Sequence, residues 1–193
     1  MTLQEFIKQY DYQGSIVLLE GKRDVLPADR QFLITIGQLL ASQTKYILFR
    51  SGNASGADEY FSQGVTSINA QRLQVITPYS GHRKKYNVAS QTVSLDSIDL
   101  LSEPAVVYET QKNKKNAKLI TDYIAGNKHA IKGAYLLRDT IKVIGTNAIP
   151  PCTVALFYDD LLQPKTGGTG HTMQVCDENN VPYMDQRVWM KWI

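Results

Sequence analysis

Short apolar runs alternate along the chain with longer segments in which apolar residues recur at helical spacing. Four runs have the β-branched and aromatic content of buried strands: Ser15–Leu19, Tyr46–Phe49, Leu73–Thr77 and Thr153–Tyr158. Helical spacing marks three segments between them: Pro27–Leu40, Ala57–Ile68 and Ala130–Ile141. We expect a last helix to begin near Gly170 and a short final strand over Val181–Met184. This alternation predicts an α/β fold with a mostly parallel sheet and helices on both faces.

One segment, Tyr86–Glu109, does not fit the alternation, and we expect an insertion or a subsidiary hairpin there. The length of 193 residues and the 43% of hydrophobic residues suffice for one domain with a sizeable core. We expect that domain to span residues 1–193, with its core over about 14–184 and a C-terminal tail over 185–193. Trp189 and Trp192 in the tail are expected to dock on the chain itself; docking on a second subunit, as in a homo-oligomer, is the alternative.

Positive charge is concentrated in two places. Residues 111–142 hold eight Lys or Arg against two Asp, and residues 72–86 hold Arg72, Arg83, Lys84 and Lys85 with no acid. Such asymmetry favours a surface for anions, with a solvated helix face as the alternative for the first run. The two cysteines and three histidines show no disulfide or metal-ligand spacing, so we expect no metal and no cofactor. Met1–Tyr12 has no apolar core, and no run approaches a membrane span, so we expect a cytoplasmic protein that does not contact membranes.

Three unusual loops follow the predicted strands, at the edge where parallel sheets bind ligands: Glu20–Asp24, Arg50–Asp58 and Lys165–Thr172. In the third loop, Gly167, Gly168 and Gly170 allow backbone N–H groups to turn toward an anion, and the following helix adds its unpaired N-terminal donors. This loop predicts a site for a phosphate or a carboxylate.

The second loop has a similar composition. Gly52 and Gly56 permit tight backbone geometry, and Ser51 and Ser55 supply hydroxyl groups. Asp58 is interpreted either as a charge partner for the helix terminus or as an acceptor for a ligand hydroxyl. Two such loops together favour a nucleotide or a sugar phosphate. The sequence contains no P-loop, no G-x-G-x-x-G after the first strand and no G-x-S-x-G elbow, and we assign no catalytic residue.

The order and spacing of three short motifs resemble the signatures of the SLOG superfamily: Gly21-Lys22-Arg23, Ser51–Asp58 and Gly167–Thr172. The chain is most similar to the branch of Smf/DprA DNA-processing proteins and YspA/YpsA-like proteins, and more distantly similar to the LOG (Lonely guy) enzymes. Tyr135–Asp139 resembles a helix of that branch, with Asp139 in place of Asn.

The resemblance implies a Rossmann-like fold that binds nucleotides, nucleotide-derived ligands or single-stranded nucleic acid. It places the following residues at the ligand: Gly21, Lys22, Arg23, Ser51, Gly52, Asn53, Ser55, Gly56, Asp58, Arg138, Gly167, Gly168, Thr169, Gly170, His171 and Thr172. Ser55 stands where the DprA-like pattern has a basic residue. Gln174 stands where LOG enzymes have a catalytic Glu, which argues against their phosphoribohydrolase reaction because an amide cannot exchange a proton.

Three functions remain in order of preference. The first is a DprA-like domain that binds a nucleotide or a nucleotide-derived small molecule, as a sensor or sequestering module. The second is a DNA-processing protein that binds single-stranded DNA, with Arg83, Lys84 and Lys85 on phosphates and Tyr79 or Tyr86 stacked on a base. The third is a hydrolase that cleaves an N-glycosidic or phosphate bond of a nucleotide.

Overall fold

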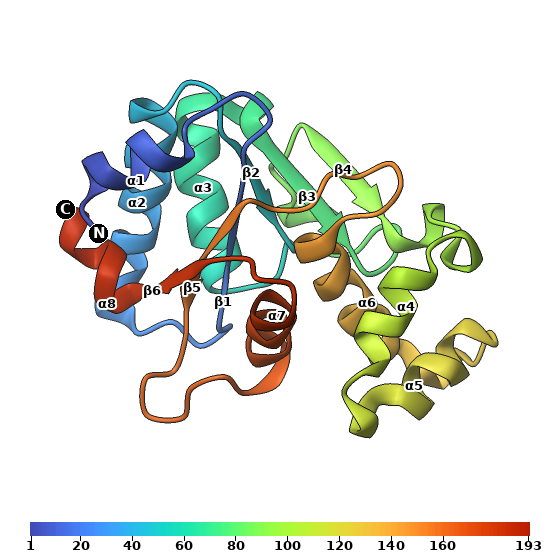
Figure 1. The fold of residues 1–193 in the computed structure, drawn as a ribbon. Coiled ribbons are helices and arrows are strands. Elements are labelled where there is room, and N and C mark those ends of the chain that lie inside the picture. The colour runs from blue at the N-terminus through green and yellow to red at the C-terminus, as the bar shows by residue number, and fades with distance from the viewer.

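The computed structural model covers residues 1–193 and describes every side chain except that of Lys128, which belongs to the basic run at 111–142. Six strands form one sheet: β1 (Ile16–Gly21), β2 (Leu48–Ser51), β3 (Leu73–Thr77), β4 (Gln91–Ser94), β5 (Val154–Tyr158) and β6 (Tyr183–Asp185). The described chain forms these α-helices: α1 (Leu3–Tyr10), α2 (Arg30–Gln43), α3 (Ala57–Asn69), α4 (Pro104–Gln111), α5 (Lys114–Ile124), α6 (Ile131–Ile144), α7 (Gly167–Glu178) and α8 (Gln186–Trp189). All strand pairs are parallel, in the order β4-β3-β2-β1-β5-β6, so the prediction of a Rossmann-like α/β fold is confirmed (Figure 1).

The two faces of β1 support two layers of helices, because successive side chains of a strand point to opposite faces. Val17 and Leu19 pack in one cluster with residues of α1, α2, α3 and α8, while Ile16 and Leu18 pack in another with residues of α6 and α7. Helices α4 and α5 pack on α6, on the second face (Figure 1). Helices therefore cover both faces, as the sequence predicts.

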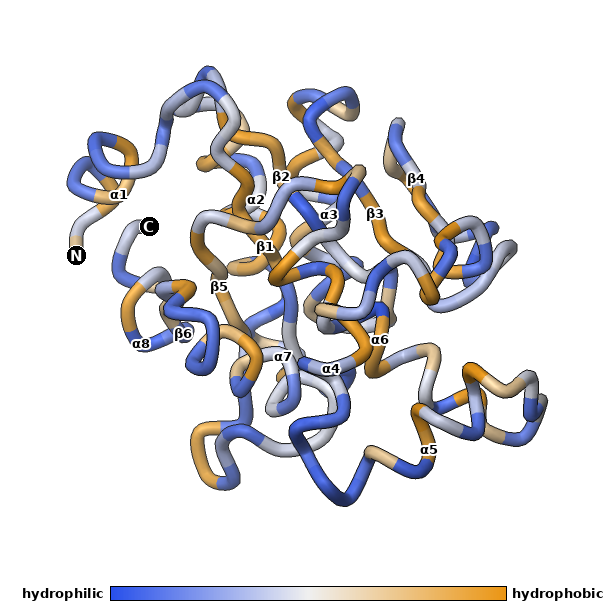
Figure 2. The backbone as a smooth tube through the Cα atoms, turned by 45° about the vertical axis from the view of Figure 1, so that its right-hand side comes forward, coloured by the Kyte–Doolittle hydropathy of each residue, from blue (hydrophilic) through white to orange (hydrophobic). Residues whose placement is uncertain are grey.

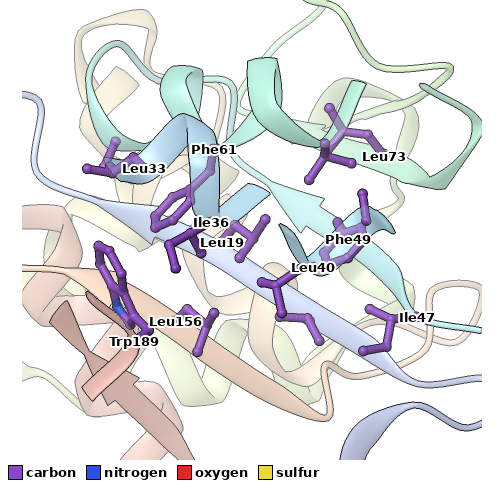
Figure 3. Close-up of a cluster of buried hydrophobic side chains, with 14 of the residues drawn as sticks. Leu19, Leu33, Ile36, Leu40, Ile47, Phe49, Phe61, Leu73, Leu156 and Trp189 are labelled. Carbon is purple, nitrogen blue, oxygen red and sulfur yellow. The ribbon is translucent and has the colours of Figure 1, made fainter. Parts of the chain in front are cut away.

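The first layer holds the larger hydrophobic cluster, in which side chains of α2 and α3 meet those of β1, β2 and β5 (Figure 3). Figure 2 shows the hydrophobic stretches of β1, β3 and β5 in the interior of the fold. Trp189 is fully buried there, with its ring 5.4 Å from that of Phe61 and its Nε1–H donating to Phe157 O. The indole of Trp192 donates to Met1 O and packs on Phe6, so both tryptophans dock within the chain, as expected.

The strand order reverses between β1 and β5. The chain builds β1 to β4 in one direction and then returns to β5 on the other side of β1. Ligand crevices in such sheets open at the carboxyl ends of the strands beside the reversal. Because β1 and β5 pair up to Gly21 and Tyr158, the loops that follow these two residues lie side by side.

Several boundaries differ from the prediction, and the sequence does not predict α1, α4, α8 or β4. The segment at 86–109 is no hairpin: it holds β4, which pairs in parallel with β3, and the start of α4. Strand β4 (QTVS) is a short, polar edge strand, so it lacks the apolar run that marks a buried strand. The other strands lie within two residues of their predicted bounds, and α7 begins at Gly167 rather than near Gly170. No helix in the described part of the chain is long and apolar enough to cross a membrane.

Candidate functional site

A cavity of about 780 Å³ opens at the reversal point, and we name it the switch-point cavity. Its walls come from the loops after β1 and β2, from α5 and α6, and from the loop that leads into α7. Among the residues that the sequence placed at a ligand, the lining includes Gly21, Lys22, Arg23, Asp58, Arg138, Gly167, Gly168, Thr169, Gly170 and His171. It also includes residues that sequence reasoning did not select as ligand contacts: Glu20, Ala54, Asn113, Asn116, Leu119, Lys132, Tyr135, Leu136, Asp139, Lys165, Thr166 and Gln174.

The N-terminus of α7 faces this cavity. The first backbone bond of the helix is donated by Gly170 N–H to Thr166 O, so the N–H groups of Gly167, Gly168 and Thr169 precede the helical ladder. Gly167 has a left-handed φ of 64°, and a Cβ at Gly170 would overlap the Lys165 carbonyl group. A Cβ at Gly168 would instead lie 3.4 Å from Asp139 Oδ2, a cavity-lining atom. The loop therefore has the open backbone that an anion site needs.

Lys22 ties the loop after β1 to the loop before α7. Its backbone N–H donates to Tyr158 O at 2.9 Å, and its Nζ donates to Thr166 Oγ1 at 2.5 Å. The same Nζ lies 3.8 Å from the buried Asp159. The predicted ligand contact Lys22 thus holds two loops together, and part of its charge is already neutralised.

The second loop is organised around its own carboxylate. Asp58, 1% exposed, accepts hydrogen bonds from the N–H groups of Gly21 (3.2 Å), Gly52 (3.1 Å) and Ala54 (3.3 Å). Gly56 has a φ of 83°, and a Cβ there would overlap the backbone of Arg23. Of the two interpretations of Asp58, the structure supports the structural one.

These contacts bear on the expectation of two anion loops. The Gly52 and Ala54 amides of the second loop already bind Asp58, so these two amides are not free for an external anion. Six residues that were expected at the ligand do not line the cavity in the described chain: Ser51, Gly52, Asn53, Ser55, Gly56 and Thr172. Asn53, with a left-handed φ of 55°, instead donates from its side chain to His82 O.

A buried ionic network forms the floor of the cavity. Lys142 Nζ lies 2.6 Å from Glu20 Oε2 and 2.8 Å from Asp139 Oδ1, and Arg138 Nε lies 2.9 Å from the same Asp139 oxygen. Thr172 donates to Glu20 Oε1 at 2.9 Å. Arg138 reaches the cavity wall as expected, but its guanidinium also donates to Gly52 O, so it mainly anchors the second loop to α6.

The two carboxylates of this network have opposite pKa shifts. Burial raises the pKa of Glu20 to about 7, although Lys142 opposes the shift. Burial acts in the same direction on Asp139, but Arg138 and Lys142 together bring the pKa of that carboxyl below its ordinary value. Asp139 is therefore ionised at neutral pH, and its Oδ2 remains a hydrogen-bond acceptor beside the α7 N-terminus.

His171 does not have the predicted position of a phosphate donor at the tip of α7. It is the fifth residue of the helix and 7% exposed, and its Nε2 lies 3.3 Å from Leu136 O and 3.2 Å from Thr140 Oγ1. Burial lowers the pKa of the imidazole despite nearby Asp139, which favours the neutral ring. Because Leu136 O can only accept, Nε2–H is directed at α6, and Nδ1 has no hydrogen-bond partner among the described residues.

Two cations of the cavity rim have no carboxylate partner. Arg23 and Lys132 are both exposed, and neither forms an ion pair with a described residue. In contrast, Lys165 pairs with Asp177 at 2.7 Å. Arg23 and Lys132 therefore supply the spare positive charge of the rim.

The predicted phosphate contacts after β3 lie outside the switch-point cavity. Arg83 pairs with Glu59 at 2.5 Å and lies over the Tyr86 ring, while Lys85 is exposed. Lys84 lines a separate cavity of about 410 Å³ at the ends of β3 and β4. A third cavity, of about 550 Å³, lies between residues 95–101 and α5–α6 and is lined by no described cation, so it does not suit a phosphate.

The fold and the cavity together define an α/β protein with an all-parallel Rossmann-like sheet and an open helix N-terminus at its reversal point. No family model matches the chain, and no curated protein is significantly similar to it. Among solved structures, it is similar to DNA processing protein A from Helicobacter pylori, which was studied for its single-stranded DNA binding mode. The TM-score is 0.56 at 16% sequence identity, over 90% of this chain and 65% of that one. A similarity at this identity establishes the fold alone, and this chain spans 65% of the length of its neighbour.

Proposed function

We propose that the chain binds single-stranded DNA and that one nucleotide of the strand occupies the switch-point cavity. One observation carries the proposal: the open N-terminus of α7 shares its cavity with Arg23 and Lys132, two cations without a carboxylate partner. A phosphate group accepts hydrogen bonds from the helix amides, and the neighbouring phosphates of a strand bind the rim cations.

The remaining walls suit a nucleotide better than a bare anion. Asp139 Oδ2 is a hydrogen-bond acceptor beside Gly168, so it fits a sugar hydroxyl or a base amino group. Asn116 of α5 and Asn113, whose Oδ1 caps that helix, offer amide groups, and the half-buried ring of Tyr135 offers a stacking surface. A nucleotide carries both a phosphate and these donor groups.

The similarity in fold to DNA processing protein A supports a strand rather than a free nucleotide as the ligand. One observation favours a mononucleotide as the ligand: the volume of the switch-point cavity, about 780 Å³, is typical of a small-molecule site. We therefore retain a mononucleotide-binding module as the second candidate.

The test measures the affinity for a labelled oligothymidylate of about ten nucleotides by fluorescence anisotropy at a series of salt concentrations. Each phosphate contact contributes about 0.7 to the slope of log affinity against log salt for a single strand. Arg23→Ala and Lys132→Ala should each weaken binding and lower that slope by about 0.7, because each removes one such contact. Lys8→Ala, which removes an exposed lysine of α1, is the matched control and should leave the slope unchanged.

Two outcomes would decide against the strand. Wild-type protein with no affinity for the oligonucleotide at low salt would overturn the proposal. Binding of thymidine monophosphate with little dependence on salt, and no binding of the oligonucleotide, would favour the second candidate.

A further inference from the structure

The cavity at the ends of β3 and β4, which we name the second cavity, is lined by polar residues and one glycine. Its volume is about 410 Å³, and it is lined by Thr77, Ser80, Gly81, His82, Lys84, Asn87, Thr92 and Ser94. Four of these residues carry hydroxyl groups, one is a cation, and none is an acid. Strands β3 and β4 belong to the same parallel sheet as β1 (Figure 1). The residues at the ends of β3 and β4 that line this cavity, Thr77 and Ser94, therefore lie at the same carboxyl edge of the sheet as Gly21 of the switch-point cavity.

Two buried polar atoms of this lining have no hydrogen-bond partner among the described residues. They are Nε2 of His82, a residue that is 8% exposed, and Oγ of Ser94. Buried polar groups are nearly always bonded, so two such atoms in one polar cavity point to a ligand that supplies the partners. Burial, and then the charges of Arg138, Arg83 and Arg23, lower the pKa of His82, so the neutral ring offers one N–H donor and no charge.

An aromatic cluster separates the two cavities. The His82 ring in the wall of the second cavity lies 5.6 Å from the ring of Tyr135, which lines the switch-point cavity, at an angle of 85°. Tyr79 completes the cluster, 5.1 Å from His82 and 6.3 Å from Tyr135. The aromatic cluster therefore connects the walls of the two cavities, and a ligand that bridges them would pass beside it.

We propose that the second cavity binds a phosphate group of the nucleotide next to the one in the switch-point cavity, in the same strand; this proposal rests on the proposed function. Lys84 supplies the charge, and the hydroxyl groups together with the His82 ring supply uncharged donors. A lining without carboxylates accepts a phosphate oxygen without repulsion, in contrast to the switch-point cavity, where Asp139 faces the ligand. The smallest ligand that fills both cavities is then a dinucleotide.

The experiment compares inorganic phosphate, thymidine monophosphate, the dinucleotide pTpT and the labelled oligothymidylate by isothermal titration and anisotropy. For wild type, affinity should rise steeply between the mononucleotide and the dinucleotide. Lys84→Ala should reduce the ratio of dinucleotide affinity to mononucleotide affinity about tenfold, which corresponds to the loss of one charge-assisted hydrogen bond. Ser94→Ala should reduce the same ratio about fivefold. Lys8→Ala is again the matched control, because Lys8 is an exposed lysine of α1 that lines neither cavity.

Ser94→Ala also separates a binding role from a structural one. Because the buried Ser94 hydroxyl has no partner in the described chain, its removal should leave the melting temperature unchanged or raise it. Wild-type affinity for pTpT in both Lys84→Ala and Ser94→Ala would overturn the second site, while weaker binding in Arg23→Ala would still support the first. No binding of any oligonucleotide by wild type would overturn both sites. An equal effect of Lys84→Ala on inorganic phosphate and on pTpT would show a free-phosphate site instead of a strand contact.

Discussion

Replacing Asp58 with alanine should destabilise the fold far more than the loss of a typical carboxylate. The Asp58 side chain is 1% exposed and accepts hydrogen bonds from three backbone N–H groups. Two of these groups belong to the buried glycines Gly21 and Gly52, and the third belongs to half-buried Ala54. A buried donor left without a partner costs about 1–3 kcal/mol. The three together therefore predict a loss of about 3–5 kcal/mol in the free energy of unfolding, with water relieving part of the cost at Ala54.

The neighbouring residue offers a matched control. Glu59→Ala also removes one carboxylate from the first turn of α3, but Glu59 is half-exposed and makes an ion pair with Arg83 that should contribute about 0–1 kcal/mol. The assay is urea and thermal unfolding followed by circular dichroism. Asp58→Ala should lower the melting temperature by roughly 10 °C, and Glu59→Ala by no more than about 3 °C.

Asp58→Asn should be intermediate, because the amide oxygen still accepts while its NH₂ group faces an N–H donor. A free energy of unfolding of Asp58→Ala within about 1 kcal/mol of wild type, the size of an ordinary surface effect, would refute this role of the carboxylate. The amides of the second loop would then be satisfied without the carboxylate and would again be candidates for an external anion.

Three further perturbations test the cavity and its floor. Gly168→Val places a branched side chain toward Asp139 Oδ2. It should weaken oligonucleotide binding at least about tenfold in titrations, with little change in melting temperature. Wild-type affinity in the folded variant would mean that the loop is only a turn. Lys142→Met leaves Glu20 and Asp139 without their shared cation and should cost about 3–5 kcal/mol in urea unfolding, whereas a cost under about 1 kcal/mol would contradict the network. The pKa of Glu20, raised from 4.5 to about 7, gives a contribution to stability that is full below pH 4.5 and is lost as the pH rises through about 7. The unfolding free energy of wild type relative to Glu20→Gln should therefore fall between pH 5 and pH 8, and a flat difference would count against the raised pKa.

The sequence predicts the centre of the sheet well because its signal is local. The run IVLLEG of β1 is buried at every position, as expected of a strand with helices on both faces, and β3 has the predicted bounds. The edge is less predictable. Strand β4 is polar and half-exposed, so only its pairing with β3 identifies it, and that pairing is a long-range contact that no short pattern encodes.

Some residues of the candidate site can likewise be predicted from local patterns, and others cannot. The glycines before α7 can be identified from composition, because an open backbone needs residues without a Cβ. The ionic network at the floor of the cavity cannot be identified in this way. Glu20 and Lys142 are 122 positions apart, and in the sequence Lys142 is one of eight basic residues in a run that is also typical of a solvated surface. Only the packing of α6 against β1 shows that Arg138 and Lys142 are buried and paired, while Lys132 of the same helix remains at the cavity rim.

The two glycine loops at the reversal point differ in a way that composition alone does not show. Both turn backbone N–H groups inward beside a helix N-terminus, but α3 has Asp58 in its first turn, and that carboxylate occupies the position of the anion. Helix α7 has no acid in its first turn, and the hydroxyl of its N-cap residue Thr166 is held by Lys22 and the Gln163 carbonyl instead of capping the helix. An anion-binding loop is therefore distinguished from a structural one by whether a side chain of the chain itself reaches the amides. By that criterion Asp58 satisfies two amides of the second loop, whereas no side chain of the described chain caps α7, because Lys22 binds the Thr166 hydroxyl.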